Sequence, residues 1–209
     1  MELKVHNISG KDTGRKVVLN DEIFKIEPNE HAVYLDVKQF MANNRQGTHK
    51  SKQRAEIRGS SKKIKKQKGT GGARAGNIKS PTIVGGGRAF GPEPRDYTIK
   101  LNKKVKQLAR KSALTFKATS NNIIVLEDFD YEQPKTKNLV ELQKSFSIEN
   151  KKSLLVVSDQ KKNVYLSSRN LKNSKVVNIS ELTTYDIVNA SALLFVESSL
   201  AVLESNLLK

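Results

Sequence analysis

The chain has 209 residues, 36% of them hydrophobic, and a net charge of +17. This length supports one hydrophobic core with an appendage, and the positive charge favours a polyanionic partner, nucleic acid first and an acidic membrane surface second. The lack of cysteine excludes disulfides and thiolate metal sites, and the lack of an apolar run of about 18 residues excludes a membrane-spanning helix.

The first 44 residues are predicted to begin a folded domain. Short strands are expected at residues 3–5, 16–19 and 22–26, with a turn between Gly10 and Gly14. A helix from Glu30 to about Asn44 should follow, because apolar residues recur there at helical spacing. No apolar signal segment opens the chain, so the protein is expected to work in the cytoplasm.

Residues 45–95 differ sharply in composition from the rest. They hold 14 Lys or Arg residues and only two acids, Glu56 and Glu93, whereas the other 158 residues hold 24 basic and 19 acidic residues. The same segment holds 10 of the 12 glycines and 3 of the 5 prolines. Its few large apolar residues cannot offset an ordering cost of about 1–2 kcal/mol per residue, so this segment should not fold alone.

Beyond residue 95 the pattern is an alternation of helices and strands. A helix is predicted over residues 103–118, with a buried stripe of Val105, Leu108, Ala109, Ala113 and Phe116. Apolar runs at 123–126, 154–157, 176–179 and 193–196 are predicted strands, and helices are expected at 136–146, 162–171 and 198–207, the last capped by Ser198 or Ser199.

This alternation is typical of parallel strands with right-handed crossovers. The predicted fold is therefore an α/β three-layer domain with a mostly parallel four-stranded sheet. Residues 1–44 and 96–209 would form that domain, and residues 45–95 would interrupt it as a long extended basic loop.

The glycine cluster at residues 69–76 does not fit a nucleotide-binding loop. The dinucleotide fingerprint requires glycine where Arg74 stands, and a mononucleotide loop requires Lys and Ser or Thr after Gly76. Glycine interleaved with Lys and Arg instead indicates close approach of bare backbone to phosphates. Only Phe90 and Tyr97 supply aromatic rings nearby, which argues against a platform that stacks single-stranded bases.

An enzymatic alternative rests on Asp128 and Asp130, which follow a predicted strand, with Asp159 after the next strand. Such carboxylates could hold Mg²⁺, with Asp128 attacking a phosphoryl group. However, Glu132 stands where phosphotransferases of the haloacid-dehalogenase type need Thr or Val, and a solvated polar loop is favoured. The histidines, His6, His31 and His49, lack ligand spacing and are expected at the surface, His49 close to phosphate. No catalytic residue, metal or cofactor is therefore predicted.

Several motifs together resemble the large ribosomal subunit protein four family of bacterial type. They include Arg45-Gln46-Gly47-Thr48, the string from Gln67 to Gly76, Gly85-Gly86-Gly87, Phe90-Gly91-Pro92 with Pro94-Arg95-Asp96-Tyr97, and Tyr185-Asp186-Ile187-Val188-Asn189-Ala190. The resemblance spans nearly the whole chain. The sequence departs from the family at Gly72, where Arg or Lys is usual, and at Ile64-Lys65, where proline and an aromatic residue are frequent.

The resemblance implies a structural constituent of the large ribosomal subunit that binds its ribosomal RNA. The loop tip would line the nascent-peptide exit tunnel, contact the nascent chain and face another ribosomal protein across the constriction; no membrane contact and no homo-oligomer are expected. A magnesium-dependent phosphotransferase and a nucleic-acid chaperone with a disordered arm remain the alternatives.

Two sets of residues are predicted to carry this function. The RNA-binding set is Arg45, His49, Lys50, Lys52, Arg54, Arg58, Lys62, Lys63, Lys65, Lys66, Lys68, Arg74, Lys79, Arg88 and Arg95. The tunnel-lining tip is Lys65, Lys66, Gln67, Lys68, Gly69, Thr70, Gly71, Gly72 and Arg74.

Overall fold

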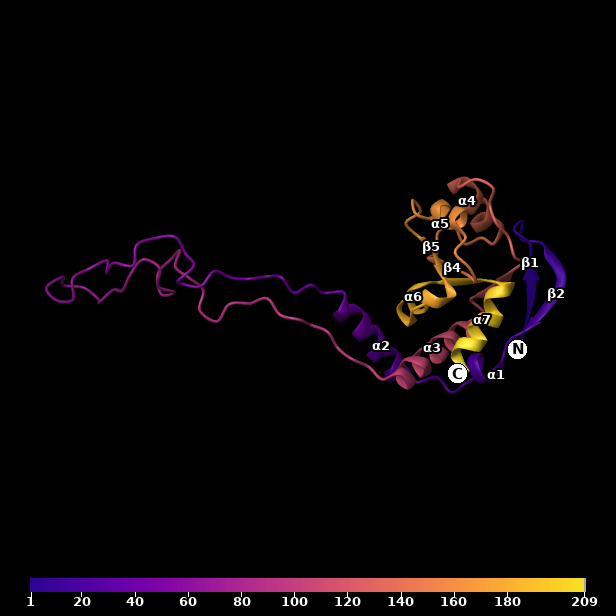
Figure 1. Cartoon of the computed structure of the whole chain (residues 1–209), viewed down its shortest axis with the longest axis horizontal. Helices are drawn as coiled ribbons and strands as arrows, with labels where there is room; N and C mark the ends of the chain where they lie inside the picture. The colour runs from indigo at the N-terminus through magenta and orange to yellow at the C-terminus, as the bar shows by residue number, and fades with distance from the viewer. Residues whose placement is uncertain (209) are drawn as a thin grey trace. The chain divides into compact units, whose positions relative to one another are not determined.

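The structure is a computed structural model, and it describes residues 1–208 (Figure 1). The described chain forms two compact units. The first, the α/β unit, comprises Met1–Met41 and the chain from Lys100 onward. The second, the basic unit, is Ala42–Ile99.

The α/β unit is built on one six-stranded sheet with the order β2-β1-β3-β6-β4-β5. Every neighbouring pair is parallel except β1 and β2, which form an antiparallel hairpin. The strands are β1 (Glu2–His6), β2 (Asp12–Val18), β3 (Ile123–Leu126), β4 (Ser153–Val157), β5 (Ser174–Asn178) and β6 (Ala192–Val196). A mostly parallel sheet is confirmed, but the expected count of four strands is wrong. The N-terminal hairpin joins the same sheet because β1 pairs with β3 in parallel.

Seven α-helices occur among the described residues. They are α1 (Asp21–Phe24), α2 (Glu30–Asn43), α3 (Lys103–Thr119), α4 (Thr136–Ser145), α5 (Lys162–Ser168), α6 (Thr184–Asn189) and α7 (Glu197–Leu207). A short 3₁₀ helix (Ile179–Glu181) follows β5. Helices α2, α3, α4, α5 and α7 match the expected segments to within a few residues.

Successive side chains of the strands belong alternately to two hydrophobic clusters. In β4, Leu154 and Val156 belong to one cluster, with side chains of α1, α3, α6 and α7, whereas Leu155 and Val157 belong to the other, with α4 and α5. Successive side chains of a strand point to opposite faces, so the two clusters lie on opposite faces of the sheet.

Two local expectations about α1 and α3 are corrected by the structure. Residues 21–24 form a helix, not a strand, because the Asn20 side chain accepts a hydrogen bond from the Glu22 backbone and caps a helical turn. The buried face of α3 includes Ser112, Leu114 and Thr115, and it leaves Leu108 and Phe116 more than a third exposed. Polar side chains there are buried because they bond to backbone carbonyls, as Thr115 does to Ile23 at 3.1 Å.

Serine does not cap α7, contrary to expectation. The N-cap residue is Val196, and the Ser198 hydroxyl instead bonds to Asp128 (2.5 Å) and Ser158 (2.9 Å). Helix α6 was not anticipated, although Thr183 caps it by accepting a hydrogen bond from the Asp186 backbone. Capping residues without a long apolar pattern are a weak sequence signal for a six-residue helix.

Candidate nucleic-acid interface

The basic unit has no hydrophobic core. Between residues 45 and 98 it has no helix and no strand beyond one antiparallel bridge, Lys63 to Asn77. None of its hydrophobic side chains is buried, and Val84 and Phe90 are fully exposed. Its backbone conformation is therefore held by hydrogen bonds and close glycine contacts.

Two antiparallel arms make up this unit: a first arm, residues 45–64, and a second arm, residues 76–95 (Figure 1). Backbone hydrogen bonds join Arg95 to Gly47 (3.2 Å), Ser51 to Pro92 (3.0 Å), Arg88 to Lys52 (2.9 Å) and Ile64 to Gly76 (3.0 Å). Every pair is centred between residues 70 and 72. The chain therefore reverses direction at the tip, residues 65–74, where Gly69 and Gly71 have φ of +77° and +63°. Glycine adopts such angles without a steric penalty.

Glycine also lets the arms approach each other closely. A methyl group placed on Gly87 would lie 2.3 Å from the backbone nitrogen of Arg54, and one on Gly47 would lie 2.1 Å from the carbonyl oxygen of Arg95. Gly91 has a similar restriction, because its methyl group would lie 2.7 Å from the Ser51 side chain. These three glycines are required by packing, whereas a methyl group on Gly69, Gly71 or Gly76 would meet nothing within 4 Å.

Tyr97 organises the positive charge at the base of the arms. The guanidinium carbons of Arg45 and Arg95 lie 3.9 Å and 4.6 Å from the centre of its ring, within the range of cation–π attraction. A hydrogen bond from Arg95 holds the pKa of the Tyr97 hydroxyl below its usual range. The hydroxyl also lies 3.4 Å from Nε2 of His49, so three polar side chains of the unit meet at the Tyr97 residue.

The two acids of the segment bond within the unit. Glu56 pairs with the Lys50 ammonium and accepts a hydrogen bond from the backbone of Gln53 (3.1 Å). The Gln53 side chain reaches across to the second arm and donates to Glu93. Sequence reasoning did not identify Gln53, because a single glutamine carries no pattern that signals such a contact.

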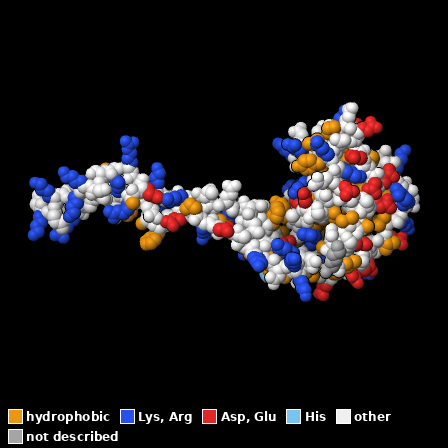
Figure 2. Space-filling view, in the orientation of Figure 1, with side chains coloured by type: hydrophobic (Ala, Val, Ile, Leu, Met, Phe, Trp, Pro, Cys, Tyr) orange, Lys and Arg blue, Asp and Glu red, His pale blue; other side chains and the backbone are white. Residues whose placement is uncertain are grey.

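The basic residues predicted to bind RNA mostly face solvent. All 15 residues of that set are exposed except Lys79, which is half-buried (Figure 2). All nine residues of the predicted tip are exposed as well. The hydrogen bond from the Lys50 ammonium to Glu56 raises the pKa of Lys50.

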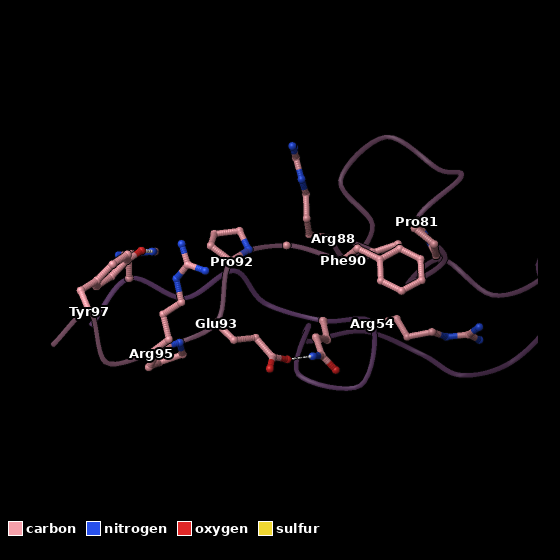
Figure 3. A pocket seen from close by; sticks show the side chains of 14 residues that line it. Arg54, Pro81, Arg88, Phe90, Pro92, Glu93, Arg95 and Tyr97 are labelled. Atoms are coloured by element: carbon pink, nitrogen blue, oxygen red, sulfur yellow. Dashed lines mark hydrogen bonds between the residues drawn. The ribbon is translucent and has the colours of Figure 1, made fainter. Parts of the chain in front are cut away.

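A groove of about 900 Å³ opens along the arms (Figure 3). Its walls carry the guanidinium groups of Arg54, Arg88 and Arg95 and the rings of Phe90 and Tyr97. The groove therefore offers positive charge and flat apolar surface together, the two features that a nucleotide can use.

The enzymatic alternative gains no support from geometry. Asp128 accepts a hydrogen bond from Ser198, and Asp130 accepts one from the backbone of its own neighbour, Tyr131 (2.8 Å). Over residues 1–208, no group of three or more His, Asp or Glu side chains is placed to hold a metal ion. The loop is less solvated than expected, because Phe129 and Tyr131 are buried.

The histidines do not gather into a site. His31 and His49 are exposed, as expected, and lie in different units. His6 is half-buried in β1, with its ring edge-on to Phe146 at 5.7 Å and its Nδ1 atom buried without a hydrogen-bond partner in the described chain. No helix among residues 1–208 has the length and apolar character needed to cross a membrane.

Comparisons with known proteins give the same family for the whole chain. The model of the ribosomal protein L4/L1 family matches residues 17–206. A protein of Christiangramia forsetii named large ribosomal subunit protein uL4 is 63% identical over 207 residues, which cover 99% of this chain and all of the relative. Proteins of the same name from Flavobacterium johnsoniae (62% over 209 residues) and Bacteroides fragilis (60% over 208 residues) match over the full length of both chains.

These matches confirm the resemblance seen in the sequence motifs. The family consists of structural ribosomal proteins, so the prediction that the chain is not an enzyme is confirmed, as is its place in the cytoplasm, within the ribosome. The glycines and arginines at 45–95 thus belong to a structural protein of a ribonucleoprotein particle. This chain is a member of the ribosomal protein L4/L1 family.

Proposed function

We propose that this chain is a structural constituent of the large ribosomal subunit and that residues 45–95 bind its ribosomal RNA. The observation that carries the proposal is the distribution of charge on the two arms. Fourteen Lys and Arg side chains lie there, nearly all exposed, while both acids bond within the unit. Such a surface displaces the cations condensed on RNA, and the release of those cations drives binding.

We propose that the chain divides at residues 44 and 96 into an α/β domain with three layers and a long extended loop. The two hydrophobic clusters on opposite faces of the sheet support the layered arrangement. The absence of buried apolar side chains between residues 42 and 99 supports a loop that gains its order from RNA.

The tip, residues 65–74, would line the nascent-peptide exit tunnel, contact the nascent chain and face another ribosomal protein. Two observations support this placement: the antiparallel pairing centred near residue 70, and the exposure of every tip residue. With about 25 residues in each direction, the extended limit of such a loop is roughly 80 Å. That reach suits a segment that passes through a large body to a distant site.

The anchoring contacts would lie at the base of the arms, where the Tyr97 ring holds two arginines in place. Arg45 and Arg95 share the Tyr97 ring, and Arg54 and Arg88 flank the groove. Side chains fixed before binding lose less conformational entropy when they meet a phosphate. The lysines at residues 62–68 are exposed, with Lys63 bonded to Gln67 (2.7 Å), and would act as flexible counterions.

Crosslinking from single positions tests both parts of the proposal. A photoreactive group on Lys68 in assembled large subunits should reach RNA or protein of the exit tunnel, and one on Arg54 should reach RNA nearer the subunit's exterior. Crosslinks from Lys68 that reach only the outer surface of the subunit would overturn the tip placement. Failure of the full-length protein to co-sediment with large subunits in high salt would overturn the ribosomal role itself.

A further inference from the structure

Phe90 has a backbone conformation that is rare for a bulky residue. Its φ is +51°, in the left-handed region, and its side chain is 109% exposed, so no packing within the protein accounts for it. A left-handed conformation at a bulky side chain is a genuine outlier, and such strain concentrates at functional sites.

Among residues 1–208, only two other non-glycine residues have positive φ, and both have an ordinary explanation. Asn121 and Ser147 each stand two positions after the last residue of a helix, α3 and α4 respectively. Left-handed residues are common at that position because they let the chain leave a helix with its carbonyls satisfied. Phe90 follows no helix.

The conformation of Phe90 is imposed by the pairing of the two arms. Before Phe90 in the chain, the backbone amide of Arg88 donates a hydrogen bond to the carbonyl oxygen of Lys52. After Phe90, the carbonyl oxygen of Pro92 accepts a hydrogen bond from the backbone amide of Ser51. The two partners on the first arm, residues 51 and 52, are adjacent in the chain. Their partners on the second arm, residues 88 and 92, are separated by three extra residues, 89–91. These residues form a bulge with Phe90 at its apex.

Glycines on each side fix this bulge. Gly87 is buried against the backbone of Arg54, and Gly91 lies against Ser51, and neither has room for a β-carbon. The ring at the apex is thus presented to solvent on a backbone that is tied down at both ends. Bulges of this kind re-aim a side chain.

The surroundings of the ring identify the class of partner. Arg54 and Arg88 line the groove near Phe90, Arg95 lines it beside Tyr97, and the groove's single acid, Glu93, is bonded to Gln53 (Figure 3). An apolar protein partner would have to bury these guanidinium groups, whereas a nucleotide offers a flat base for the ring and a phosphate for the arginines. The Phe90 ring is fully exposed, and arginines stand near it on both arms. This combination of an exposed ring and guanidinium groups fits RNA as the partner.

We propose that Phe90 stacks on an unpaired nucleobase of the ribosomal RNA, with the adjacent phosphates held by Arg54 and Arg88. The inference rests on the proposed RNA-binding function and adds a base contact to it. A single stacked base at Phe90 is compatible with the expectation that this segment is not a platform that stacks successive single-stranded bases. An exposed Phe with left-handed backbone is a feature that the sequence alone does not reveal.

Binding to deproteinised large-subunit RNA of Flavobacterium johnsoniae separates stacking from charge. The full-length Phe90→Leu variant should bind about fivefold to a hundredfold more weakly than the wild type, with an unchanged dependence on salt. The Phe90→Trp variant should bind about as tightly as the wild type, because it keeps an aromatic ring. Val84→Leu is the matched control, because Val84 is equally exposed in the same unit and should tolerate the change.

The variants should all fold, because the Phe90 ring is packed against nothing that its loss would expose. Equal affinity of the wild type and Phe90→Leu would overturn the stacking contact while leaving salt-dependent RNA binding intact. Failure of the wild type itself to bind the RNA would instead refute the underlying function.

Photo-crosslinking identifies what the ring touches. Full-length protein with benzoylphenylalanine at position 90, assembled into large subunits, should form a crosslink to one nucleotide that is unpaired in the RNA. The same group at position 84 should not reach that nucleotide. A crosslink from position 90 to a ribosomal protein, or to a base-paired helix only, would contradict the proposal.

Discussion

The backbone amide of Arg88 donates a hydrogen bond to the carbonyl oxygen of Lys52, 2.9 Å away, and so joins two positions 36 residues apart. Beside this bond lies Gly87, the only buried residue between positions 42 and 99. The register of the arms, and with it the presentation of Phe90 and the groove arginines, depends on this junction.

Replacing Gly87 with alanine should break the junction. The new methyl group would lie 2.3 Å from the Arg54 backbone, and relief of that overlap should cost about 1–3 kcal/mol of local stability. Hydrogen exchange at the Arg88 amide of the RNA-bound protein should quicken, and affinity for ribosomal RNA should fall about tenfold. Gly76→Ala is the control, because its methyl group meets nothing within 4 Å. Equal exchange rates in both variants would show that the junction is not sterically determined.

RNA binding should depend steeply on salt. If about eight basic groups neutralise phosphates, the log–log slope of affinity against salt should be about −6 to −7. Arg54→Gln should reduce the magnitude of that slope by about 1, whereas Lys16→Gln, in the α/β unit and paired with Glu2, should leave it unchanged. Filter binding across a series of salt concentrations measures both, and a nearly flat dependence for the wild type would refute counterion release as the main driving force.

Without RNA, limited trypsin should cut first between Arg45 and Arg95. This segment offers 14 cleavage residues and no buried hydrophobic side chain, whereas the α/β unit is held by two hydrophobic clusters. Both flanking fragments should stay associated on gel filtration, because β1 and β3 pair within one sheet. Strong protection of the segment in RNA-free protein would contradict the prediction.

Removing the tip should spare assembly but alter the tunnel. A variant in which two glycines replace residues 65–75 keeps the Lys63–Asn77 bridge and the Ile64–Gly76 hydrogen bond that close the arms. It should still enter large subunits, because the anchoring arginines remain. Ribosomes that carry it should show changed nascent-chain stalling and macrolide sensitivity. Unchanged behaviour in both assays would count against a tunnel-lining tip.

Tyr131 should make the α/β unit less stable at high pH. Burial raises the pKa of its hydroxyl to about 12, and the hydroxyl has no hydrogen-bond partner among the described residues. Below pH 10 the phenol is neutral in both the folded and the unfolded chain. Between pH 10 and about 12 only the unfolded phenol ionises, so the free energy of unfolding should fall as pH rises.

The Tyr131→Phe variant isolates this effect. It should be about 1 kcal/mol more stable than the wild type at neutral pH, because an unpaired buried hydroxyl is removed. The difference should widen above pH 10 in urea unfolding followed by circular dichroism. Tyr165→Phe, at an exposed position, should change stability little. A difference between Tyr131→Phe and the wild type that narrows above pH 10 would contradict the assignment.

The sequence by itself determined the main strands and the long helices to within a few residues, and it showed where the basic residues concentrate. These features depend on local patterns. Four buried strands, such as residues 154–157, are continuous apolar runs. The net charge of +12 over residues 45–95 is a property of composition alone. The family also followed from the sequence, because its motifs are short strings of adjacent residues.

Tertiary structure decided what depends on distant partners. The N-terminal hairpin joins the main sheet only because Val5 pairs with Val125, 120 positions away. The buried face of α3 differs from the predicted apolar stripe, because buried hydroxyl groups such as that of Thr115 donate hydrogen bonds to backbone carbonyls of another element. The left-handed Phe90 and the role of Gln53 arise from the pairing of the two arms. Each of these contacts joins residues far apart in the chain, and no periodicity or composition of a single segment encodes which partner it will meet.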